Sequence, residues 1–320
     1  MKGKHLITVK SRRLQYKFTI ERNITILRGD SATGKTTLID MIASYQNNGE
    51  NSGIMISSDK PCAVLSGIHW KENLSLIKDS IVFIDEGDRF VSSKEFAEAA
   101  KASDNYYVIA TRSSLFNLPY SVKEIYGIKN KSGNRYQGTK RLYSEFYPLV
   151  ETSLPVIQKP DLVIAEDSNS GYQFFAKVFD EFGIPCVSAN GKSNIYRELV
   201  SREYSTALVI ADGAAFGPEI ERVYALKAAK QIILFLPESF EWLILKSDLL
   251  KNAEVNKILT TPNDSIESHD YFSWEQFFTH LLIKNTQGTY LQYNKQQLNP
   301  NFMQPHEQES ILEEVPPFDF

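Results

Sequence analysis

The feature that most constrains this chain is a glycine-rich loop between a short apolar run and a predicted helix. The run Ile24–Leu27 is rich in β-branched residues, and the pattern of residues 38–42 predicts a helix. Between them, Gly29–Thr36 fits G-x-x-x-x-G-K-[ST], the pattern of a phosphate-binding loop. A strand that leads through such a loop into a helix predicts an α/β domain that binds a nucleoside triphosphate.

The chemistry of this loop depends on its glycines, its lysine and its hydroxyl groups. Gly29 and Gly34 allow backbone conformations that a Cβ would forbid, so backbone N–H groups can surround a phosphate near the positive end of the helix dipole. Lys35 is predicted to reach the β- and γ-phosphates, and Thr36 to offer its hydroxyl to Mg²⁺. The predicted ATP-binding residues are Gly29, Asp30, Ser31, Ala32, Thr33, Gly34, Lys35, Thr36 and Thr37.

A second apolar run ends in two acidic residues. Residues Ile81–Ile84 are followed directly by Asp85 and Glu86. A strand that is buried on both faces is continuously apolar, and its carboxyl end faces the ligand crevice of a parallel sheet. We therefore predict that Asp85 holds Mg²⁺ through water, and that Glu86 polarises the water that attacks ATP.

The first half of the chain resembles ABC-type ATPases. The resemblance rests on the loop, on the acidic strand end and on a predicted hairpin over residues 5–20, whose arginines Arg12 and Arg13 are either nucleotide contacts or a solvated turn. Another buried strand ends at Thr111 and Arg112, where ABC-type proteins usually carry the histidine that senses the γ-phosphate. The chain lacks an LSGGQ-like signature. The resemblance therefore implies a P-loop NTPase core of reduced, ABC-like form over residues 1–147.

The second half of the chain predicts another parallel α/β domain. Prolines at 148, 155 and 160 predict a linker over 148–160, and apolar runs then alternate with predicted helices over 161–246. Glu166, Asp212 and Glu241 each follow a predicted strand. The carboxyl ends of parallel strands meet at one edge, so these three acids are expected to lie together.

This second half resembles the Toprim domain of OLD-family nucleases, which join an ABC-like ATPase to a Toprim domain in the same order. The resemblance rests on Glu166 before an aromatic-rich helix, on Gly191–Asn194, on Asp212 and on Ser239-x-Glu241. It implies that Glu166, Asp212 and Glu241 bind one or two Mg²⁺ or Mn²⁺ ions and cleave the phosphodiester bonds of DNA or RNA. Relatives of this architecture serve in defence against phage.

Two carboxylates of the family pattern are absent from this chain. Ser170 stands where an Asp is expected, and Ala214 replaces the second acid of an Asp-x-Asp pair; Asp167, Glu219 and Glu221 are candidate substitutes. The resemblance therefore leaves two functions open. One is an ATP-dependent metallonuclease in phage defence or mobile-element biology. The other is an ATP-dependent regulator whose degenerate Toprim-like domain docks a partner without cutting nucleic acid.

Charge and cysteine content limit which partners and which compartment the sequence predicts. The net charge of −4 gives no global basic signature for nucleic acid, so any such contact needs a local patch. Cys62 and Cys186 have no metal-binding spacing, and the chain shows no signal-peptide or membrane-span pattern. We expect a cytoplasmic protein without a membrane partner. ATPases of this kind commonly act as homo-oligomers or with a partner ATPase or effector chain.

The remaining residues, 247–320, are predicted to form a C-terminal extension. Residues 273–283 have the pattern of an amphipathic helix that opens at a serine cap. Residues 289–293 are predicted to form a strand, and the prolines at 316 and 317, with scattered acids, predict a loose end.

Overall fold

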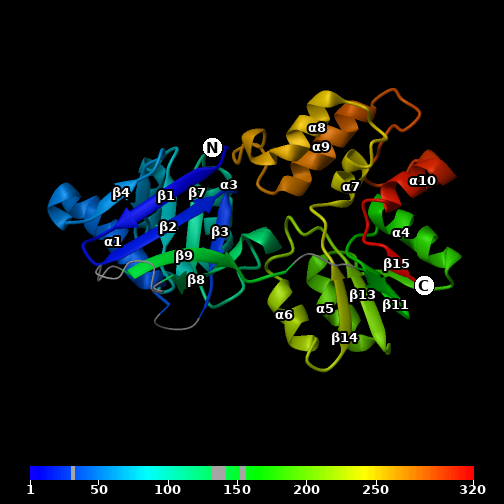
Figure 1. Cartoon of the computed structure of the whole chain (residues 1–320), viewed down its shortest axis with the longest axis horizontal. Helices are drawn as coiled ribbons and strands as arrows, with labels where there is room; N and C mark the ends of the chain where they lie inside the picture. The colour runs from blue at the N-terminus through cyan, green and yellow to red at the C-terminus, as the bar shows by residue number, and fades with distance from the viewer. Residues whose placement is uncertain (30–32, 132–141, 152–155) are drawn as a thin grey trace. The chain divides into compact units, whose positions relative to one another are not determined.

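The computed structural model describes residues 1–29, 33–131, 142–151 and 156–320, and they form two compact units (Figure 1). The first unit contains Met1–Tyr120, Glu124–Val150 and Pro262–Phe272. The second contains Ser121–Lys123, Glu151–Thr261 and Ser273–Phe320. Each unit combines helices with a β-sheet, so the predicted α/β class is confirmed.

The first unit is built on a mixed sheet. Its strands are β1 (His5–Lys10), β2 (Leu14–Ile20), β3 (Ile24–Leu27), β4 (Met55–Ser57), β5 (Cys62–Val64), β6 (Ile81–Ile84), β7 (Tyr106–Ala110), β8 (Ile125–Asn130) and β9 (Leu142–Pro148). They lie in the order β4-β1-β2-β9-β8-β3-β7-β6-β5. The neighbours from β8 to β5 pair in parallel, so β3, β7 and β6 end at the same edge, with β7 in the middle.

Helices cover this sheet through apolar side chains. The helices of the region are α1 (Lys35–Asn48), α2 (Trp70–Leu76) and α3 (Lys94–Lys101), with 3-10 turns η1 (Gly49–Ser52), η2 (Arg89–Ser92) and η4 (Pro262–Asp264). The turn η3 (Val122–Glu124) lies where the chain passes between the two units, with Val122 and Lys123 in the second. Leu38 and Ile42 of α1 are buried in one core with strands β1, β3 and β6. The ring of Phe96 on α3 packs edge-on against Tyr107 of β7 and Trp70 of α2. Burial of these large side chains fixes the strands whose ends carry the predicted site.

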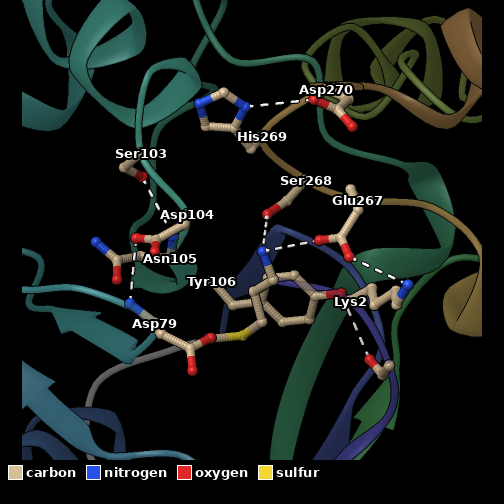
Figure 2. A network of polar contacts seen from close by, with 12 residues as sticks. Lys2, Asp79, Ser103, Asp104, Asn105, Tyr106, Glu267, Ser268, His269 and Asp270 are labelled. Carbon is tan, nitrogen blue, oxygen red and sulfur yellow. Dashed lines mark hydrogen bonds and ion pairs between the residues drawn. The ribbon is translucent and has the colours of Figure 1, made fainter.

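A segment of the predicted C-terminal extension, Pro262–Phe272, belongs to the first unit. Figure 2 shows the carboxylate of Glu267 beside the ammonium of Lys2, at 3.2 Å. The side-chain amide of Asn23, the residue before β3, donates to the carbonyl of Phe272 at 2.7 Å. The chain therefore returns to the first unit between helices that belong to the second.

The second unit is built on a parallel sheet. Its strands are β11 (Leu162–Ala165), β12 (Cys186–Ser188), β13 (Thr206–Ile210) and β14 (Gln231–Phe235), in the order β12-β11-β13-β14. Every neighbouring pair is parallel, as predicted for this half of the chain. Two short strands, β10 (Ile157–Gln158) and β15 (Phe318–Asp319), form a separate parallel pair. The predicted loose end is therefore wrong at β15, because its backbone pairs with β10.

The helices of the second unit are α4 (Ser170–Glu181), α5 (Lys192–Ser201), α6 (Ile220–Leu226), α7 (Phe240–Lys246), α8 (Ala253–Thr260), α9 (Trp274–Thr286) and α10 (Pro305–Leu312), with the turn η5 (Pro300–Met303). Helix α4 packs on β11 and β12, and α7 packs against α8, α9 and α10 (Figure 1). The amphipathic helix predicted over 273–283 is confirmed as part of α9. No described helix is long and apolar enough to cross a lipid bilayer.

The strand predicted over Thr289–Tyr293 is wrong, because these residues form turns. Side chains form hydrogen bonds with the backbone groups of these residues, where a neighbouring strand would otherwise do so. The N–H of Tyr293 donates to the hydroxyl of Thr286 at 3.0 Å, and the amide of Asn299 donates to the carbonyl of Tyr290 at 2.8 Å.

Candidate functional site

The predicted phosphate loop leaves β3 and enters α1. Three of its predicted nucleotide-binding residues lie outside the described part of the chain: Asp30, Ser31 and Ala32. Gly29 (φ 128°) and Gly34 (φ 95°) have the left-handed backbone conformations that favour glycine. The ammonium of Lys35 donates to the carbonyl of Gly29 at 2.6 Å and to the hydroxyl of Thr33 at 3.2 Å. Lys35 therefore spans the loop from the first turn of α1.

Tyr16 of β2 supports this loop, and sequence reasoning did not single it out. Its hydroxyl donates to the carbonyl of Gly34 at 3.1 Å. A Cβ on Gly34 would lie 2.7 Å from the same hydroxyl oxygen. Both the positive φ and this close approach therefore require glycine at the start of α1.

The two predicted Mg²⁺ ligands of the first unit lie together. The hydroxyl of Thr36, at the start of α1, donates to the carboxylate of Asp85 at 3.4 Å. Thr36 and Thr37 are both exposed, and Asp85 directly follows β6. A hydroxyl and a carboxylate are hard oxygen donors, which Mg²⁺ prefers. The donor set and its place beside the loop fit a magnesium ion that accompanies a nucleotide.

Glu86, the predicted hydrolytic residue, is paired with an arginine. Its carboxylate lies 2.6 Å from Nε of Arg112, which follows β7. The buried hydroxyl of Thr111 instead donates to the carbonyl of Ser113 and accepts from its N–H, both at 3.0 Å. Of the two residues considered as a γ-phosphate sensor, Arg112 is thus the one that contacts Glu86.

The predicted acids of the second unit follow β11, β13 and β14. Glu166 directly follows β11, and its carboxylate accepts a 2.8 Å hydrogen bond from the backbone N–H of Asp212, just beyond β13. Both residues line a pocket of about 30 Å³, together with Asp167. That volume is enough for a water molecule or a single ion. Glu166 and Asp212 are therefore brought to one opening, as predicted.

Glu241, in the first turn of α7, has a different environment. Its carboxylate is buried, accepts a hydrogen bond from the hydroxyl of Tyr293 at 3.0 Å, and lies 3.6 Å from the ammonium of Lys295. It does not line the pocket of Glu166 and Asp212. Sequence reasoning missed Tyr293 and Lys295, because no local motif marks them and the region was predicted as a strand and an extension.

Burial and mutual repulsion shift the protonation of these acids. Burial, and then the charge of Glu275 on α9, raise the pKa of Glu166 to about 7. Burial, and then the charges of Glu166 and Glu275, raise the pKa of Asp212, which Lys295 opposes. Burial alone would lower the pKa of Lys295. The negative charges of Glu241 and Asp212 favour the protonated form more strongly, so the pKa of Lys295 is raised. The acids of this site repel one another, and a bound cation would stabilise their charged forms.

The fit to a metal ion is partial. Among the residues that the structure describes, no group of three or more acidic, histidine or cysteine side chains is arranged to hold a metal ion. Glu241 is engaged by Tyr293 and Lys295. Glu166, Asp167 and Asp212 line the pocket, and Asp167 already accepts the backbone N–H of Tyr172. The carboxylates of Glu166 and Asp212 are therefore the main oxygen donors there, which fits one divalent cation better than a pair.

Asp167 and Glu219, two of the candidates to replace the absent carboxylates, already have other partners. The carboxylate of Asp167 accepts the backbone N–H of Tyr172 at 3.0 Å, within the first turn of α4. Glu219 is buried beside α6, and its carboxylate lies 3.9 Å from Arg222. Glu221 lies in the first turn of α6.

The raised pKa of Glu166 makes a prediction about cation binding. A proton and a divalent cation compete for the same carboxylate, so we expect Mn²⁺ affinity to rise about tenfold per pH unit below pH 7 and to level off above it. Electron paramagnetic resonance of free Mn²⁺ between pH 5.5 and 8.5 measures this. Glu166→Gln should remove most of the dependence, and a flat profile in the unaltered protein would contradict the assignment.

No protein-family model matches this chain, and no curated protein matches it significantly. The functional argument therefore rests on the residues and on their geometry.

Proposed function

We propose that this chain is an ATP-binding and ATP-hydrolysing protein whose second unit is a Toprim-like, metal-dependent nuclease. The observation that supports it best is the hydrogen bond between Thr36 and Asp85. These two side chains come from separate elements, α1 and the end of β6, and the sequence predicts both as Mg²⁺ ligands. Their meeting beside the Gly29–Thr36 loop is what a P-loop NTPase requires.

In the first unit, the residues have separate roles. Lys35 exchanges its contacts to Gly29 and Thr33 for phosphate oxygens, while Thr36 and Asp85 hold Mg²⁺. Bound Mg²⁺ would neutralise charge on the phosphates. Glu86 orients the attacking water and accepts its proton. Arg112, which is paired with Glu86 in this structure, would turn toward the γ-phosphate when a nucleotide is bound.

In the second unit, Glu166 and Asp212 would hold a divalent ion at the carboxyl ends of β11 and β13. When bound, Mg²⁺ or Mn²⁺ would activate water and stabilise the leaving oxygen of a phosphodiester. Glu241 and Tyr293 keep the ammonium of Lys295 next to the acids. This ammonium provides a fixed positive charge for the scissile phosphate where a second metal would otherwise be needed.

The proposal is tested with the purified full chain and mixed single- and double-stranded DNA and RNA. Cleavage is followed with Mg²⁺ or Mn²⁺, with and without ATP. We expect metal-dependent cleavage that responds to ATP. An absence of cleavage under every condition, with ATP still bound, would reject the nuclease half of the proposal.

The ATP half is tested by Lys35→Ala. Loss of charge-assisted hydrogen bonds to the phosphates is expected to weaken ATP binding roughly 100-fold. Isothermal titration calorimetry measures the affinity. Lys192→Ala is the matched control, since Lys192 also follows a glycine and begins a helix but lies in the second unit. Equal ATP affinity in Lys35→Ala and the unaltered chain would reject the phosphate loop.

A second function is favoured by one observation. The described acids form no group of three that is arranged for a metal, and Glu241 is already paired with Lys295. An ATP-dependent regulator, whose Toprim-like unit binds nucleic acid or a partner without cutting it, is compatible with this arrangement. Mn²⁺ affinity distinguishes the two functions, because only the nuclease requires the ion at Glu166 and Asp212.

A further inference from the structure

Ser170 stands where the Toprim pattern has a metal-binding acid. Its hydroxyl instead bonds the backbone at Asn294 and Lys295. Ser170 is the first residue of α4 and is fully buried. Its hydroxyl lies 2.6 Å from the carbonyl of Asn294 and 2.7 Å from that of Lys295, and its backbone N–H donates to the Lys295 carbonyl at 3.0 Å. The start of α4 is thus fastened to the backbone that carries Lys295.

A second residue on the same face of α4 extends this attachment. The amide nitrogen of Gln173 donates to the carbonyl of Gln296 at 3.1 Å, and its amide oxygen accepts from the N–H of Leu298 at 2.8 Å. Ser170 and Gln173 are three positions apart, so they lie one above the other on the helix. Together they hold an irregular segment that has no strand partner of its own.

The side chain of Lys295 is the functional end of this segment. Its ammonium lies 3.6 Å from Glu241 and 3.5 Å from the hydroxyl of Thr279 on α9. A flexible lysine has many rotamers, so a defined position next to the acids depends on a fixed backbone. The carbonyl that Ser170 binds belongs to Lys295 itself.

We propose that Ser170 is a positioning residue that fixes the ammonium of Lys295 beside Glu241 and in the field of Asp212. An aspartate at 170 would place its negative charge against the carbonyl oxygens of Asn294 and Lys295, which are acceptors only. At position 170 the chain therefore has a residue that holds the backbone of Lys295, whose ammonium is an internal cation, where the Toprim pattern has a metal ligand. The role in cleavage rests on the proposed nuclease function, but the position of Lys295 does not.

The first test follows Lys295 directly and needs neither metal nor cleavage. Acetic anhydride labels lysines in the folded full chain, and peptide mass spectrometry gives the rate at each one. Ser170→Ala should speed labelling of Lys295 roughly tenfold, because the hydroxyl proton shared between the carbonyls of Asn294 and Lys295 is lost. Lys192, which donates to the carbonyl of Ala215, is the internal control and should keep its rate. An unchanged rate at Lys295 would overturn the proposal.

The second test asks whether Ser170 acts through Lys295. We expect Ser170→Ala to slow cleavage roughly tenfold in the unaltered chain, and less than about twofold in a Lys295→Met background. Equal losses in both backgrounds would overturn the positioning role. If Ser170→Ala does not fold, Gln173→Ala takes its place, with a smaller effect in the same direction. If the unaltered chain does not cleave, the proposed nuclease function fails, and the labelling rates alone decide whether Ser170 positions Lys295.

Discussion

Nucleic-acid cleavage is expected to fall by roughly a thousandfold or more when Glu166→Gln and Asp212→Asn are combined, since a metal site contributes several kcal/mol to such a reaction. The two side chains supply the oxygen donors that face the pocket. Gln at 166 still offers an oxygen to the backbone N–H of Asp212, so the local geometry is retained. Initial rates with Mn²⁺ on the most rapidly cut substrate measure the loss.

This loss should not come from unfolding. Folding raises the pKa of Glu166 to about 7, so the folded state disfavours its charged form. The stability cost of ionisation is absent below the unfolded pKa and increases as the pH rises toward 7. At pH 8 the neutral variants should therefore melt at the same temperature as the unaltered chain or at a higher one.

Glu203→Gln is the matched control for the double variant. Glu203 is exposed and lies between α5 and β13, before the amino end of that strand, so it stands at the opposite edge of the same sheet. Its substitution should leave the cleavage rate unchanged. Equal cleavage by the double variant and the unaltered chain would remove Glu166 and Asp212 from the chemistry.

The parts of this molecule that sequence reasoning found are those with a local signal. Runs such as Ile81–Ile84 and Leu162–Ala165 are continuously apolar because both faces of their strands are buried, and each became a strand. The acids that follow such runs are placed by the strand itself. Thus the meeting of Thr36 with Asp85, and of Glu166 with Asp212, followed from spacing and strand direction.

The parts that sequence reasoning missed depend on contacts between distant residues. Lys295 lies 3.6 Å from Glu241, and Ser170, more than a hundred residues earlier, bonds the Lys295 backbone; nothing in the residues around 295 indicates these contacts. The strand predicted over 289–293 failed for the same reason, since a strand needs a neighbouring strand and these residues bond to side chains. The return of Pro262–Phe272 to the first unit is likewise set by partners near the N-terminus.

Glu86→Gln is expected to slow ATP hydrolysis about a thousandfold, within the range for loss of a general base, while ATP affinity changes less than about threefold. Glu86 follows β6 directly after Asp85, and so lies beside the residue expected to hold Mg²⁺. Glutamine has nearly the same shape and still accepts a hydrogen bond from Arg112, but it cannot take a proton from water. Single-turnover hydrolysis and calorimetric ATP binding separate the two effects.

Arg112→Ala is the control variant that separates a base role of Glu86 from a role as the ion-pair partner of Arg112. The Glu86 carboxylate is one-third exposed and the Arg112 side chain is 57% exposed, so their ion pair contributes less than about 1 kcal/mol to folding, and neither variant should change the melting temperature much. If Glu86 served only as the partner of Arg112, both variants would slow hydrolysis equally. A base role instead requires the larger loss in Glu86→Gln. Unaltered turnover in Glu86→Gln would remove Glu86 from the mechanism and leave nucleotide binding as the role of this edge of the sheet.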